Sequence, residues 1–134
     1  INELIFLLTK QYPYVSILLN ATPQDLPKAE SISIKFPCNV KILKYSHEVL
    51  NFCALVKQAD AVISPDTAII HIAAAFDRPV VGLYKNSIEH CIEWGPEHSK
   101  SIIVMPDGKQ EIYTITPQKV FNAFIELNDR YKIV

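Results

Sequence analysis

The sequence lacks several patterns that would mark common classes of protein. Only three glycines occur among its 134 residues, and neither a G-x-G-x-x-G run nor a P-loop is present, so nothing supports a dinucleotide or ATPase site of those types. The net charge is −1 and the pI is near 6.5, which provides no basic field for nucleic acid or an acidic membrane. No apolar run approaches the ~18 residues that span a bilayer. We therefore expect neither a nucleic-acid partner nor a transmembrane segment.

Cysteine and methionine are also scarce. The three cysteines are odd in number and widely spaced, which favours reduced thiols in a cytoplasmic protein over a disulfide framework. The only methionine is Met105, and the chain reads as helix from Asn2 onward with no strand before it. We therefore expect a piece of a longer protein, cut after a preceding strand.

The sequence does contain a regular alternation of short apolar runs and amphipathic stretches, which is typical of α/β proteins. The apolar runs predict five strands, at residues 14–20, 40–43, 61–64, 79–84 and 101–105. Helices are predicted over 1–12, after Thr22-Pro23, over 47–58, after residue 67, over 88–94 and after Thr116-Pro117. Right-handed crossovers make such a sheet mainly parallel. We expect a single Rossmann-like, doubly wound domain over residues 1–134.

The predicted helix at 47–58 carries its apolar residues at helical spacing. Ser46 is a candidate N-cap. The residues expected to pack on the sheet are Val49, Phe52, Cys53 and Val56, with Leu50 and Leu55 broadening the stripe.

A candidate site lies in the stretch 59–84, where a strand enters a Pro-Asp-Thr corner and a helix follows. Ser64, Asp66, Thr67 and His71 gather at or near that helix N-terminus, and open α/β sheets bind ligands at the carboxyl ends of their strands. A helix N-terminus favours phosphate. Because a carboxylate repels a diphosphate, we assign Asp66 to sugar hydroxyls, and Thr67 with the backbone to phosphate.

Structural interpretations of the same residues remain open. Ser64 or Asp66 is equally a simple N-cap, and a histidine in an apolar run, such as His71, is often a core residue. His90, Cys91 and His98 match no zinc spacing, so no metal site is predicted. Cys53 lies on a predicted core stripe rather than at a strand end, which disfavours a Cys–His hydrolase. Trp94 is expected to pack or to border a pocket.

The run from Ala59 to Thr67, with His71, Ala73-Ala74-Ala75 and then 79–84, resembles glycosyltransferase family 9, the bacterial ADP-heptose:lipopolysaccharide heptosyltransferases. The resemblance extends from His47 to about Pro96, and its Asp-Thr-x-x-x-His-x-Ala-Ala core is fairly specific. It implies the GT-B architecture, in which two Rossmann-like domains face one cleft. This chain is then similar to the C-terminal, donor-binding domain without its first strand.

The resemblance also implies roles for individual residues. Asp66 would contact the donor sugar, Thr67 and the following backbone N–H the diphosphate, and His71 would be catalytic by neutralising charge on the leaving diphosphate. The sequence departs from the family at Ala68, where the family has glycine, and at Tyr84-Lys85, where it has Phe-Gly. Lys85 either supplies positive charge or marks a different donor. The expected substrate-binding set is Ser64, Asp66, Thr67, Ala68, His71 and Lys85.

The function expected from this resemblance is donor binding in an inverting, metal-independent transferase without a cofactor. It would move heptose from ADP-heptose to lipopolysaccharide core, and the missing N-terminal domain would bind most of the acceptor and supply the catalytic base. The fragment alone is expected to be inactive. The expected location is cytoplasmic, with the parent either free or peripheral at the cytoplasmic face of the inner membrane. Two alternatives stay open: another nucleotide-sugar donor, or a non-catalytic α/β interaction domain.

Overall fold

The computed structural model describes residues 1–43, 48–96, 100–108 and 111–134. By its contacts the chain divides into two compact units, residues 1–49 and 50–134, and each is described by itself. Every strand pairing in both units is parallel, which confirms the predicted α/β class.

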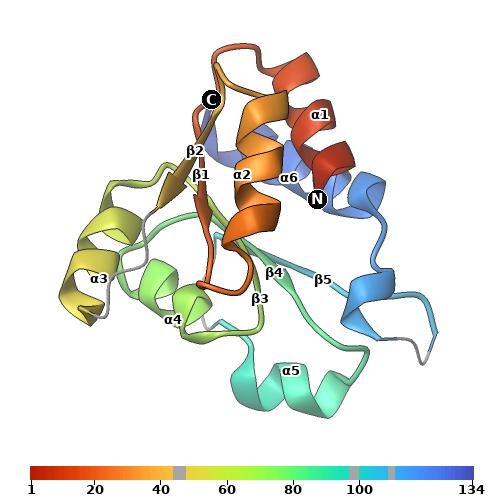
Figure 1. The fold of residues 1–134 in the computed structure, drawn as a ribbon. Coiled ribbons are helices and arrows are strands. Elements are labelled where there is room, and N and C mark those ends of the chain that lie inside the picture. Colours follow the sequence, from red (N-terminus) through yellow and green to blue (C-terminus); the bar gives the residue numbers. More distant parts are fainter. Residues whose placement is uncertain (44–47, 97–99, 109–110) are drawn as a thin grey trace. The chain divides into compact units, whose positions relative to one another are not determined.

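The first unit is two helices packed with a pair of parallel strands (Figure 1). Its elements are α1 (Asn2–Gln11), β1 (Ile17–Asn20), α2 (Leu26–Lys35) and β2 (Val40–Leu43). Ile5 of α1, Ile32 of α2 and Val40 of β2 form a buried cluster. The helices therefore join the strands through one small apolar core.

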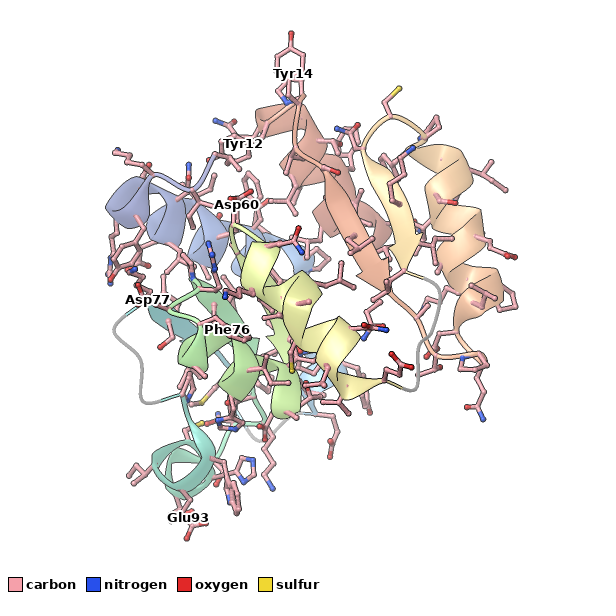
Figure 2. All side chains as sticks on the ribbon, turned by 90° about the vertical axis from the view of Figure 1, so that its left-hand side faces the viewer. Tyr12, Tyr14, Asp60, Phe76, Asp77 and Glu93 are labelled. Atoms are coloured by element: carbon pink, nitrogen blue, oxygen red, sulfur yellow. The ribbon has the colours of Figure 1, made fainter. Side chains whose placement is uncertain are left out.

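Two boundaries in this unit differ from the sequence-based prediction. β1 begins at Ile17 rather than Tyr14, because Pro13 and Tyr14 form a turn and the Tyr14 side chain is fully exposed, pointing outward in Figure 2. α2 begins after Asp25 rather than after Thr22. The Thr22 hydroxyl instead bonds the Asp25 carboxylate at 2.6 Å, so the predicted capping residue closes a turn before the helix.

The second unit is a three-stranded sheet in the order β3-β4-β5. Its helices and strands are α3 (Val49–Gln58, from Leu50 on), β3 (Val62–Pro65), α4 (Ala68–Ala75), β4 (Val80–Leu83), α5 (Ile88–Trp94), β5 (Ser101–Val104), the 3-10 turn η1 (Ile112–Thr114) and α6 (Pro117–Tyr131). The central strand β4 is buried along most of its length. Val80 packs in a cluster with Ile70 of α4. The next residue, Val81, points to the other face because strand side chains alternate, and α6 packs on β4 and β5.

The predicted apolar stripe of α3 is only partly correct. Phe52 and Val56 pack on the core of the second unit, and Cys53 is half-buried. Val49 and Leu50, in contrast, are 68% and 82% exposed, because contact with the core begins one turn later. The predicted cap Ser46 and the first predicted residue, His47, lie outside the described residues.

Among the helices in the described part of the chain, none combines the length and the apolar character needed to cross a bilayer.

Candidate functional site

The predicted corner lies where β3 ends and α4 begins. Ser64 pairs with Gly82 and Pro65 with Leu83 in the parallel register. The Asp66 N–H then donates to the Leu83 carbonyl at 3.0 Å, which continues the ladder one residue past the strand. The corner is therefore fixed to β4 at the carboxyl edge of the sheet, the position where such sheets bind ligands.

Ser64 and Thr67 form a hydroxyl pair inside this corner. The Ser64 side chain is 3% exposed and its hydroxyl donates to the Pro65 carbonyl at 2.9 Å. Since that proton is committed, the Thr67 hydroxyl is the donor in the 3.1 Å contact between the two side chains. Thr67 holds the N-cap position of α4, and among the described residues its side chain makes no capping hydrogen bond. The hydrogen bond to Ser64 therefore takes the place of the capping bond that the Thr67 hydroxyl would otherwise make to the first turn of α4.

The first turn of α4 is consequently open. Among the described residues, the first amide of α4 with a hydrogen-bond acceptor is that of Ile70, which donates to the Thr67 carbonyl at 3.1 Å. The amides of Ala68 and Ile69 precede it and carry the positive end of the helix dipole. Thr67, Ala68 and His71 are all exposed. His71 lies one turn beyond Thr67 on the same side of the helix. The alternative of a core histidine is therefore wrong.

The Asp66 side chain turns toward α5, where it meets His90, a residue that no sequence pattern assigns to this corner. Asp66 Oδ2 lies 2.5 Å from His90 Nε2, and each of the two side chains is 26% exposed. The pair is 24 residues apart in sequence, and no local pattern could have joined them. In the sequence, His90 stands out only beside Cys91 and His98, which match no zinc spacing, and His98 lies outside the described residues.

Tyr84 is the buried residue that ties α5 to this corner. Its ring is fully buried, and its hydroxyl donates to the Trp94 carbonyl at 3.0 Å, which attaches the end of α5 to β4. Burial, reinforced by the nearby Asp66 carboxylate, raises the pKa of Tyr84 to about 12. Gly82 makes room for the ring, because a Cβ at that position would lie 2.8 Å from Tyr84 Cε2.

Two neighbours of Tyr84 complete this support. Burial and the Asp66 charge also raise the pKa of the Cys91 thiol, so this cysteine is kept as an uncharged packing group. The Trp94 side chain is 56% exposed. Trp94 therefore contributes its carbonyl as the acceptor for the Tyr84 hydroxyl, and its side chain is about half exposed.

Lys85 follows Tyr84 at the same carboxyl edge of the sheet and is exposed. The loop that carries it is held by its neighbour Asn86, whose Nδ2 donates to the Gly108 carbonyl at 2.6 Å. The structure therefore places Ser64, Asp66 and Thr67 in one corner, where Ser64 bonds Thr67 and Asp66 bonds Leu83 and His90. Ala68 and His71 follow along α4, and Lys85 lies on an adjacent loop.

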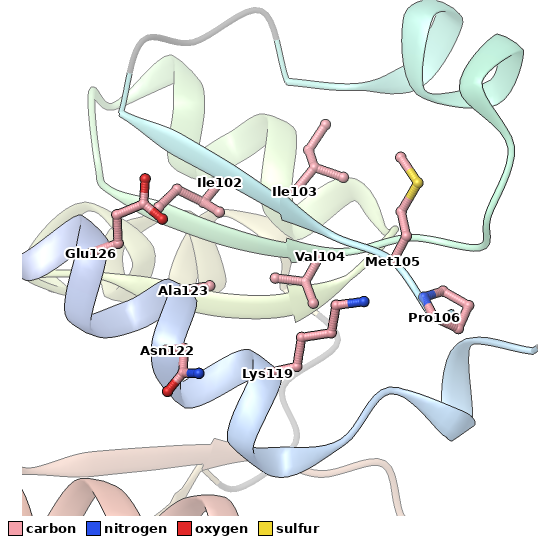
Figure 3. A pocket seen from close by; sticks show the side chains of 9 residues that line it. All are labelled: Ile102, Ile103, Val104, Met105, Pro106, Lys119, Asn122, Ala123 and Glu126. Atoms are coloured by element: carbon pink, nitrogen blue, oxygen red, sulfur yellow. The ribbon is translucent and has the colours of Figure 1, made fainter. Parts of the chain in front are cut away.

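A hollow lies between β5 and α6 (Figure 3). It contains none of the predicted site residues; its lining is Ile102, Ile103, Val104, Met105, Pro106, Lys119, Asn122, Ala123 and Glu126. Across the described ranges, no three His, Cys, Asp or Glu side chains are grouped so as to hold a metal ion.

Comparison with known proteins gives the family. The model of glycosyltransferase family 9 (heptosyltransferase) matches residues 15–121, which is most of the chain. The chain belongs to glycosyltransferase family 9. This family 9 chain is 40% identical over 96 residues to the putative lipopolysaccharide heptosyltransferase 4 of Escherichia coli K12, covering 67% of this chain and 25% of that protein. It thus spans about a quarter of the length of this curated relative.

Solved structures agree with the fold of this family 9 chain. E. coli heptosyltransferase WaaC with ADP aligns with a TM-score of 0.79 at 24% identity, over 94% of this chain and 38% of that one. E. coli ADP-heptose lps heptosyltransferase II aligns with a TM-score of 0.78 at 22% identity, over 98% and 41%. A family 9 glycosyl transferase from Veillonella parvula gives 0.77 at 14% identity, over 97% and 42%. The predicted Rossmann-like fold of the GT-B glycosyltransferases is confirmed.

Proposed function

We propose that this chain is the donor-binding part of an inverting heptosyltransferase that moves heptose from ADP-heptose to lipopolysaccharide core. The observation that carries the proposal is the uncapped N-terminus of α4, which presents Thr67, Ala68 and His71 to solvent beside Asp66. Family membership supports the reaction class, and one structural neighbour is described with ADP.

The diphosphate of the donor occupies the first turn of α4. The amides of Ala68 and Ile69 donate to phosphate oxygens there. The Thr67 hydroxyl adds a further donor when its proton turns from Ser64 to a phosphate oxygen. Ser64, being buried, takes part through Thr67 rather than by direct contact. Asp66 accepts from sugar hydroxyls, because its charge disfavours phosphate and favours hydroxyl donors.

His71 and Lys85 act on the charge that develops during transfer. An acceptor oxygen forms a bond to the anomeric carbon on the face opposite the diphosphate, and the breaking carbon–oxygen bond leaves its electron pair on ADP. His71 stabilises this growing charge from the exposed side of α4, and Lys85 contributes from the loop after β4. Because His71 and Lys85 stabilise the charge on the leaving ADP, the proposed transfer requires no metal ion and no cofactor. The base that takes the acceptor proton lies outside this chain.

Residues 1–134 form, in this proposal, one nucleotide-sugar domain of a longer two-domain protein. In the described residues β1 is hydrogen-bonded on one side, to β2. An upstream parallel strand joined to α1 by a right-handed crossover would pair with the other edge of β1. The acceptor binds mainly to the other domain, and transfer takes place on the cytoplasmic side of the inner membrane. This chain alone does not transfer sugar.

The test is sugar transfer by the full-length parent protein to lipopolysaccharide core, with ADP-heptose, UDP-glucose and GDP-mannose as donors and with EDTA present. We expect transfer from ADP-heptose alone, unaffected by EDTA. Transfer from UDP-glucose or GDP-mannose instead would show that the donor is a nucleotide-sugar other than ADP-heptose. Failure to bind or use any of the three would favour a non-catalytic interaction domain.

A further inference from the structure

We propose that His90 is a positioning residue that orients the Asp66 carboxylate toward the donor sugar. This inference rests on the proposed function, in which Asp66 accepts from sugar hydroxyls. His90 lies outside the Asp-Thr-x-x-x-His segment and comes from a different helix, α5. It reaches the site through its contact with Asp66.

The contact fixes the one part of Asp66 that the backbone leaves mobile. The Asp66 main chain is held by its amide bond to the Leu83 carbonyl at 3.0 Å. The side chain is held by His90 Nε2, which lies 2.5 Å from Oδ2 and donates its proton to it. A carboxylate accepts several hydrogen bonds at once, so the bond at Oδ2 leaves Oδ1 to accept from the ligand. The two bonds together select one orientation of a side chain that is only 26% exposed.

His90 is itself held by the structure around α5. Its amide donates to the Ser87 hydroxyl at 3.2 Å, which caps the helix at its start. The Tyr84 hydroxyl holds the far end of α5 through the Trp94 carbonyl, and the Tyr84 and His90 rings lie 6.2 Å apart between centroids. The Tyr84 ring fits because position 82 is glycine. Asp66 is therefore oriented by a chain of contacts that begins in the buried strand β4.

Such support has a distinct signature in binding. A group that is already oriented loses less conformational freedom when a ligand binds. Because Asp66 serves the sugar while α4 serves the diphosphate, loss of His90 weakens binding of the sugar nucleotide and leaves binding of the nucleotide alone unchanged. Damage to the fold would weaken both ligands.

The experiment measures dissociation constants of ADP-heptose and of ADP by calorimetry on the full-length parent. We expect His90→Ala to weaken ADP-heptose about tenfold, the loss of roughly one charged hydrogen bond, and to leave ADP within about twofold. His90→Gln, whose amide nitrogen reaches the same position, restores most of the affinity. Glu93→Gln is the matched control, because Glu93 is exposed on the same helix and points outward from it (Figure 2).

Two further readouts assign the effect to Asp66. In an Asp66→Ala background, His90→Ala should cause no additional loss of ADP-heptose affinity. In the ligand-free protein, the Asp66 carboxyl carbon resonance should shift in His90→Ala and not in Glu93→Gln. Unchanged ADP-heptose affinity in His90→Ala, equal loss for ADP, or additive effects of the two substitutions would each overturn the positioning role. If the unaltered parent binds ADP-heptose no better than ADP, the proposed use of the sugar by Asp66 fails instead.

Discussion

The helices α4 and α6 both begin after a threonine. Within the described residues, the threonine side chain caps the N-terminus of α6 and does not cap that of α4. Each has a threonine at the N-cap position with extended backbone, Thr67 and Thr116. Thr116 accepts a hydrogen bond from the Lys119 amide at 3.3 Å, and Pro117 removes one of the remaining donors. Thr67 instead bonds Ser64, and an exposed alanine follows it.

The difference shows how one residue type serves structure in one place and binding in another. At α6 the Thr116 hydroxyl accepts from the Lys119 amide, and Pro117 has no N–H to satisfy, which stabilises the helix. At α4 the buried Ser64 diverts the cap, so the first-turn amides remain directed at solvent and at whatever binds there. The carboxylate beside each helix differs too, since Asp107 near α6 pairs with Lys119 on the surface, whereas Asp66 is held by His90.

The largest expected effect comes from Asp66→Ala in the full-length parent. We expect kcat/KM for ADP-heptose to fall by roughly 10- to 100-fold, because a charged hydrogen bond to the sugar contributes about 1.5–3 kcal/mol. Asp107→Ala, which removes the carboxylate near α6, should leave transfer unchanged. Full activity of Asp66→Ala combined with earlier melting would make Asp66 a purely structural residue.

Gly82→Ala tests the support beneath the α4 corner. The new methyl group would lie 2.8 Å from Tyr84 Cε2 and 3.2 Å from Ile70 Cδ1, so the unfolding free energy should fall by about 1–3 kcal/mol. Hydrogen exchange should show the loss in β4 and α5 first. Unchanged protection in these two elements would mean that the Tyr84 ring adjusts without cost.

Much of the fold could be predicted because its signals are local. The Thr116-Pro117 start of α6, the bounds of α5 and the bounds of β2 all agree with the structure. Such caps and short apolar runs act within a few residues of chain. Val49 and Leu50 were assigned to the core wrongly, because periodicity gives the direction of a side chain and not where the core ends.

The candidate site was predictable as a set of residues and not as a set of contacts. The bond of Thr67 to Ser64 and the pairing of Asp66 with His90 depend on how β3, β4 and α5 come together. The sequence places His90 after another strand altogether.

The buried phenol of Tyr84 predicts a dependence of stability on alkaline pH. Its pKa is raised by burial from about 10 in the unfolded chain to about 12 in the folded one, so the folded state retains a proton that the unfolded state loses. The resulting stabilisation is complete below about pH 10 and is lost as the pH rises through 12, by on the order of 2–3 kcal/mol in all. Urea unfolding at pH 9 and pH 11 should show this loss, and Tyr84→Phe should lack that part of it.

The smallest expected effects come from substituting the two N-cap threonines, Thr116 and Thr67. Thr116→Ala should lower the unfolding free energy by about 1 kcal/mol, since it removes a working cap. Thr67→Ala should change stability less and should weaken ADP binding severalfold. Thermal melting and calorimetric titration of both variants would measure this, and equal losses of stability would show that Thr67 is a cap after all.

The most direct test of the account is a titration of the full-length protein with ADP-heptose, followed through its backbone amide resonances. We expect the amides of Ala68 and Ile69 to shift strongly and saturably, because they meet the diphosphate, while the first-turn amide of Lys119 in α6 does not move. Saturable binding that leaves Ala68 and Ile69 unshifted would contradict the claim that the open N-terminus of α4 is the donor site.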